Sequence, residues 1–149
     1  MDYAVRNAFR TLFTIELNED LWKRAKNRLR AYPHIQICQG DSCKVLPEIL
    51  KVISDQACLF WLDGHYSGGI TARGPRETPI VQELTTIFAH RVKDHVILID
   101  DARCFDGTHD FPTLERLHEL VEHERPDYAF SVINDVIRIH PPKEVLCAL

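Results

Sequence analysis

The sequence predicts one α/β domain spanning residues 1–149, in which a mostly parallel sheet carries helices on both faces and ends in an antiparallel hairpin. Two observations support this prediction. Apolar strand segments alternate with amphipathic helical segments along almost the whole chain, and 149 residues fit one ordinary domain. Strands that are apolar on both faces are typical of a doubly wound parallel sheet.

The first part of the chain is expected to contain three strands and two helices. Asn18 is a typical N-cap and is followed by the acidic pair Glu19 and Asp20, which indicates a helix start. Pro47 predicts that the second helix begins late or irregularly. The expected segments are a strand at 12–17, a helix at 19–31, a strand at 34–38, an apolar helical segment at 45–50 and a strand at 57–62.

The second part of the chain continues the alternation and then changes to antiparallel strands. Pro79 favours the first turn of a helix, and Asn134-Asp135 between two strand-like runs indicates a hairpin turn. The segment 64–78 is long for a strand-to-helix connection, which is typical of a lid or binding loop. The expected segments are a helix at 79–90, a strand at 95–99, a helix from about Pro112, and strands at 128–133 and 136–140.

Composition excludes several classes of function. The net charge of -4 gives no general attraction to nucleic acid, and no apolar run approaches the length of a membrane-spanning helix. The N-terminus lacks the pattern of a secretory signal, so we expect a cytoplasmic protein. Five cysteines without paired spacing disfavour a disulfide framework or a zinc site.

Acidic residues follow four successive strand segments. Ligands of open α/β sheets bind beyond the carboxyl ends of the parallel strands, so these side chains are candidates for a binding site. An acid after a strand is also a common turn former or helix cap, and for Asp41 the two interpretations are equally supported. Glu16 is followed by the better cap Asn18, which favours a functional role. The acids are Glu16, Asp41, Asp63 and the pair Asp100-Asp101.

The strongest candidates for a binding site are Asp63, Asp100 and Asp101. They are expected to follow the ends of neighbouring strands and to face one crevice. Three carboxylates, those of Asp63, Asp100 and Asp101, provide the oxygen ligands that Mg²⁺ prefers. The adjacent His65 has an ordinary pKa suitable for a general base. These residues therefore predict a metal site with a neighbouring base.

In order and spacing, four motifs resemble those of class I S-adenosylmethionine-dependent methyltransferases, with the second half most similar to the macrocin O-methyltransferase branch. The motifs are Thr14-Ile15-Glu16-Leu17, Gly40-Asp41-Ser42, Leu62-Asp63-Gly64-His65-Tyr66 and Ile99-Asp100-Asp101. The resemblance implies a Rossmann-like fold and S-adenosylmethionine as cofactor. It implies that Glu16 holds the ribose, that Asp41 and Ser42 contact the adenine, and that Asp63 belongs to the same cofactor site. In that branch Mg²⁺ binding maps onto Asp63, Asp100 and Asp101, and His65 replaces an acid proposed as the base.

The function implied is O-methylation of a small-molecule hydroxyl with help from a metal ion, by a chain able to form homo-oligomers. The family's opening strand and Gly-rich turn have no counterpart here, so the sheet is expected to be incomplete at the N-terminus, with two strands left without a partner. Two alternatives stay open. One is an inactive remnant of the fold that acts as an interaction or oligomerisation module, and the other is a metal-dependent phosphoesterase.

Overall fold

The structure, a computed structural model, describes residues 9–64 and 78–142. Expectations for residues 1–8, and for most of the loop 64–78, lie outside the described residues. The elements are β1 (Leu12–Glu16), α2 (Glu19–Arg28), β2 (Ile35–Gln39), α3 (Ser42–Val52), β3 (Leu59–Leu62), α4 (Ile80–Ala89), β4 (Val96–Ile99), the 3₁₀ helix η1 (Ala102–Cys104), α5 (Leu114–Glu124), β5 (Ala129–Ile133) and β6 (Val136–His140). The predicted alternation of helices and strands is confirmed.

The described strands form two sheets, which are separated between β1 and β3, in line with the expected incomplete sheet. β1 and β2 pair in parallel, and the second sheet has the order β3-β4-β6-β5. β3 and β4 are parallel, whereas β6 is antiparallel to both β4 and β5, which confirms the predicted C-terminal hairpin. Among the described residues no strand joins β1 to β3, so the doubly wound arrangement of the sheet stays a prediction.

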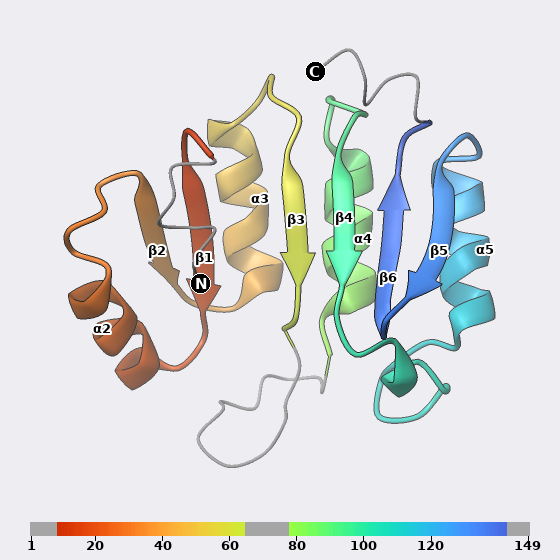
Figure 1. The fold of residues 1–149 in the computed structure, drawn as a ribbon, viewed down its shortest axis with the longest axis horizontal. Coiled ribbons are helices and arrows are strands. Elements are labelled where there is room, and N and C mark those ends of the chain that lie inside the picture. The colour runs from red at the N-terminus through yellow and green to blue at the C-terminus, as the bar shows by residue number, and fades with distance from the viewer. Residues whose placement is uncertain (1–8, 65–77, 143–149) are drawn as a thin grey trace.

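The inner edges of β1 and β3 carry backbone groups without a strand partner among the described residues. Leu12 N–H donates to the His34 carbonyl at 2.9 Å, so alternate residues of β1 face β2, and the backbone groups of Phe13 and Ile15 face the other side. By the same alternation the backbone of Trp61 faces away from β4. Figure 1 shows β1 and β3 on either side of this gap, with α3 behind it. This arrangement agrees with the expectation of two strands that lack a partner.

The hydrophobic core lies between the four-stranded sheet and the helices α4 and α5, which pass behind the strands in Figure 1. Its fully buried side chains come from each of these layers, with branched residues alternating along β4 and β6. The fully buried apolar side chains include Leu84, Ile87, Ile97, Leu117, Val121, Ile137 and Ile139. Their burial fixes the position of β3 and β4 along α4. The ends of both strands therefore lie next to the start of that helix.

Helix α3 begins earlier than Pro47 suggested. Asp41 is its N-cap, and the side chain of Asp41 accepts a hydrogen bond from Cys43 N–H at 3.0 Å. Pro47 lies inside the helix, where its missing N–H removes one helical hydrogen bond. Leu46, Ile49 and Leu50 are buried, and this burial stabilises the helix despite the proline. The prediction of a late start was therefore wrong.

The turn between β5 and β6 also holds the segment that follows β4. Asn134 and Asp135 both have positive φ angles, 54° and 64°, as a type I′ hairpin turn requires. The Asp135 carbonyl accepts Ala102 N–H at 2.9 Å, and its side chain accepts Arg103 N–H at 2.9 Å. The hairpin therefore fixes η1, directly after the acidic pair at the end of β4.

Gly40 is required by the turn that follows β2. Its φ is +141°, and an added Cβ would lie 3.0 Å from Cγ2 of Val45. Replacing Gly40 with alanine should lower the free energy of unfolding by about 1–3 kcal/mol, because the backbone is strained and Val45 must move. Urea denaturation followed by circular dichroism measures this change. Gly64→Ala is the control, since its Cβ would meet only ordinary contacts from 3.5 Å, and equal losses in both variants would contradict the prediction.

Candidate functional site

The candidate site lies along the edge where the parallel strands end. In Figure 1 the strands β1, β2, β3 and β4 all point to the lower edge of the molecule. The predicted acids follow these ends, so the expectation that they share one edge is supported for the described strands. Asp63 and Asp100 line one pocket together, whereas Glu16 and Asp41 lie at the end of the two-stranded sheet.

Glu16 closes the turn between β1 and α2 and is half-buried. Its Oε1 accepts Asn18 N–H at 2.8 Å, and its carbonyl accepts Gly40 N–H at 3.0 Å, which links the ends of β1 and β2. Asn18 caps α2, as predicted, by accepting from the N–H groups of Asp20 and Leu21. A carboxylate offers about four lone-pair positions, so Glu16 retains capacity to accept hydroxyl groups of a ligand.

Asp41 and Ser42 form the turn from β2 into α3. Asp41 acts as the N-cap of α3, so the capping role left open by the sequence is present. Lys44 Nζ lies 3.7 Å from Asp41 Oδ2, in an exposed i,i+3 pair that contributes little to stability. Ser42, the first residue of α3, lies close enough to Glu83 for its side chain to lower the pKa of that carboxyl group.

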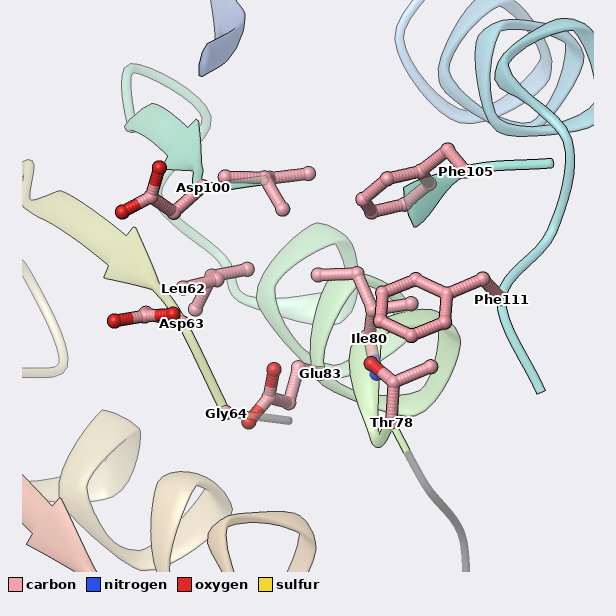
Figure 2. Close-up of a pocket in the computed structure, with 10 residues that line it drawn as sticks. Leu62, Asp63, Gly64, Thr78, Ile80, Glu83, Asp100, Phe105 and Phe111 are labelled. Atoms are coloured by element: carbon pink, nitrogen blue, oxygen red, sulfur yellow. The ribbon is translucent and has the colours of Figure 1, made fainter. Parts of the chain in front are cut away.

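A small pocket opens at the ends of β3 and β4. Figure 2 shows the carboxylates of Asp63 and Asp100 on one side of it, the rings of Phe105 and Phe111 on the other, and Glu83 near Gly64. The two phenylalanine rings pack edge to face with centroids 5.2 Å apart. The described lining residues are Leu62, Asp63, Gly64, Thr78, Ile80, Glu83, Ile99, Asp100, Phe105 and Phe111. The described wall is therefore acidic and aromatic, without a Lys or Arg side chain.

Glu83 is the residue of the pocket that the sequence analysis missed. It is 4% exposed and lies in the first turn of α4. Burial raises the pKa of the Glu83 carboxyl group, the charge of Asp41 raises it further, and the hydrogen bond with Ser42 opposes both effects. The signal was present in the sequence, because an acid at this position lies on the same helix face as the apolar residues Ile80, Leu84 and Ile87.

The predicted metal ligands are not brought together. Asp101 has a left-handed backbone with φ 55°, and its Oδ1 lies 2.6 Å from Nη2 of Arg103, which also pairs with Asp135. Asp101 is not part of the pocket wall that contains Asp63 and Asp100. Within residues 9–64 and 78–142, no group of three His, Cys, Asp or Glu side chains is placed to hold a metal ion. The described donor set therefore does not fit Mg²⁺, and His65, the predicted base, lies outside the described residues.

Comparison with known proteins supports the fold. No protein-family model matches the sequence, and no curated protein matches it. Among solved structures the chain is similar to the "crystal structure of a putative caffeoyl-CoA O-methyltransferase from Staphylococcus aureus", with a TM-score of 0.50 and 15% sequence identity. The match covers 87% of this chain but 64% of that protein, so the chain spans less than two thirds of its length. At this identity the similarity shows a shared α/β fold and nothing about activity.

The helices of the described residues are short. None of them is both long and apolar enough to cross a membrane.

Proposed function

We propose that this chain is an S-adenosylmethionine-dependent methyltransferase that acts on a hydroxyl group of a small molecule. The observation that carries the proposal is the row of acidic side chains at the carboxyl ends of β1, β2, β3 and β4, in a fold similar to that of a solved structure described as an O-methyltransferase. In sheets of this kind ligands bind at that edge. The proposal assigns the cofactor to Glu16, Asp41, Ser42 and Asp63.

The carboxylate and hydroxyl side chains assigned to the cofactor suit its nucleoside part. A half-buried carboxylate such as Glu16 accepts hydrogen bonds from vicinal hydroxyl groups, and such charge-assisted bonds are stronger than neutral ones. When bound, the cofactor supplies an electrophilic methyl group. The chain's own contribution is to orient the acceptor and to exclude water from the acidic, aromatic pocket between Asp100 and Phe111.

Proton removal from the acceptor is assigned to His65, which directly follows Asp63 and Gly64 in the sequence. Because the described carboxylates do not form a metal site, no step of the proposal uses a metal ion. Partners are expected to be the small-molecule acceptor and, as the sequence suggested, a second copy of the chain.

Calorimetric titration with S-adenosylhomocysteine, the product form of the cofactor, tests the proposal. We expect saturable binding in the micromolar range that is unchanged when EDTA is added. The chain must be shown to be folded by circular dichroism in the same buffer. A folded chain that does not bind would contradict the proposal and would favour the interaction-module alternative.

A further inference from the structure

We propose that Asp135, in the turn between β5 and β6, is a positioning residue that holds the aromatic wall of the pocket in place through η1. Asp135 is not among the described residues that line the pocket. It acts through Arg103 and Phe105. Only the description of this wall as the acceptor side of the site rests on the proposed function.

Three groups of Asp135 contact η1. Its carbonyl oxygen accepts the N–H of Ala102 at 2.9 Å. Its Oδ1 accepts the N–H of Arg103, also at 2.9 Å, and its Oδ2 pairs with Nη1 of Arg103. The first N–H groups of a helix have no acceptor within the helix itself. One residue of the distant hairpin therefore supplies acceptors for the first two N–H groups of η1.

η1 in turn determines the position of Phe105. The N–H of Phe105 donates to the carbonyl of Ala102 at 3.2 Å, so the residue that Asp135 binds also binds the backbone of Phe105. Phe105 is 5% exposed, and its ring lies edge to face against Phe111 with the centroids 5.2 Å apart. Figure 2 shows these two rings across the pocket from the strand-end carboxylates. The position of the aromatic wall therefore follows that of η1.

The segment after β4 depends on this support because it is irregular. Asp101 has a φ of 55°, and η1 is a single turn of three residues, whose hydrogen-bond geometry is poorer than that of an α-helix. The hairpin is regular by comparison, because β5 pairs with β6 along its whole length and β6 pairs with β4. The turn at Asp135 is thus a firm point from which the pocket wall is held.

The side chain of Asp135 can be removed without disturbing the hairpin. Its φ of 64° is a conformation that glycine adopts readily, and Asn-Gly is a favoured type I′ turn. Asp135→Gly therefore keeps the turn and the carbonyl that binds Ala102, and removes only the two side-chain contacts with Arg103. Asn134→Gly is the matched control, because it makes the same change at the neighbouring exposed position, where φ is 54°.

Amide hydrogen exchange measured for single residues tests the contact with η1. In Asp135→Gly the N–H of Arg103 loses its acceptor, so we expect roughly tenfold faster exchange there and unchanged exchange in β5 and β6. Asp135→Asn keeps an oxygen for that N–H and should exchange as wild type does. Unchanged exchange at Arg103 in Asp135→Gly would overturn the inference. Equal acceleration in β5 and β6 would also count against it, because the effect would then be one of hairpin stability.

Fluorine NMR of the chain labelled with 4-fluorophenylalanine tests the position of the wall. The resonances of Phe105 and Phe111, assigned with leucine variants, should move in Asp135→Gly and stay in place in Asn134→Gly. The resonance of Phe88, which is 3% exposed and belongs to the core, should stay in place in both variants. Unmoved resonances of Phe105 and Phe111 would overturn the inference even where the exchange result agreed with it.

Titration with S-adenosylhomocysteine separates this inference from the proposed function. Asp135→Gly leaves Glu16 and Asp41 unchanged, so its affinity should stay within about twofold of wild type. A loss of more than about tenfold would show that the effect of Asp135 is not confined to the wall and would count against the inference. A wild-type chain that fails to bind would contradict the proposed function, while the exchange and fluorine results still decide the role of Asp135.

Discussion

Replacing Glu16 with alanine should weaken the binding of S-adenosylhomocysteine by more than about a hundredfold. Under the proposed function, the Glu16 carboxylate accepts two ribose hydroxyl groups. Alanine removes both charge-assisted bonds, and each such bond contributes about 1.5–3 kcal/mol. The affinity is measured by isothermal titration calorimetry. This is the largest effect we expect on ligand binding.

The conservative variant separates ligand binding from the local turn. Glu16 also accepts Asn18 N–H at 2.8 Å, so alanine removes a turn contact as well. Glu16→Gln keeps an oxygen acceptor for that N–H but removes the charge, and we expect it to bind about tenfold more weakly than wild type. Glu19→Ala is the matched control, because Glu19 is exposed and pairs only with Lys23 in the described contacts. Wild-type affinity in Glu16→Gln would contradict the assignment of the ribose to this carboxylate.

The second large effect is on stability at low pH and depends on His95. This side chain is 2% exposed, and its Nδ1 accepts Cys58 N–H at 3.1 Å, which leaves the proton on Nε2 to donate to Nδ1 of His90 at 2.8 Å. Burial, and then the charge of His90, lower the pKa of His95 from 6.5 to about 4. Protonation would place a hydrogen on Nδ1 against the N–H of Cys58.

The direction of the pH effect follows from the lowered pKa. Above pH 6.5 His95 is neutral in both the folded and unfolded states, and its contribution is fully present. As the pH falls from 6.5 to about 4 the unfolded chain takes up a proton first, so the free energy of unfolding falls by about 3 kcal/mol. Glu83 acts in the opposite direction, because its raised folded-state pKa stabilises the protein as the pH falls through that value.

Comparing variants separates the contribution of His95 to the pH dependence of the free energy of unfolding from that of Glu83. Urea denaturation at several pH values between 7 and 4 gives the free energy of unfolding for wild type, His95→Gln and His123→Gln. As the pH falls, the free energy of unfolding should decrease by about 3 kcal/mol less in His95→Gln than in wild type. His123→Gln, which changes a side chain that is 82% exposed in wild type, should follow wild type. Parallel curves for wild type and His95→Gln would show that this histidine is not the cause.

Local signals predicted most of the secondary structure. Asn18 caps α2 and Asn134-Asp135 forms the hairpin turn, as predicted, because each of these features depends on the residue itself and its close neighbours. Pro47 misled the prediction, because the burial of Leu46, Ile49 and Leu50 outweighs one missing hydrogen bond. That burial is a tertiary effect, and the presence of a proline does not predict it.

In the candidate site, too, some features follow from local sequence signals and others depend on tertiary packing. The sequence placed Glu16, Asp41, Asp63 and Asp100 at strand ends, and parallel pairing brings the members of each pair to one edge. It could not show that Asp101 turns away to Arg103, because that orientation depends on a left-handed backbone and on the distant Asp135. It did contain a signal for Glu83, an acid on the apolar face of α4, but the burial of that side chain depends on packing between distant segments.

The sequence by itself determined the order of helices and strands, the C-terminal hairpin and the acidic character of one sheet edge, because hydrophobic periodicity and capping act over a few residues. Only the tertiary structure decided that Glu83 is buried and that Asp101 lies against Arg103 and outside the pocket of Asp63 and Asp100. Those features depend on which distant segments pack together, and packing is a property of the whole folded chain.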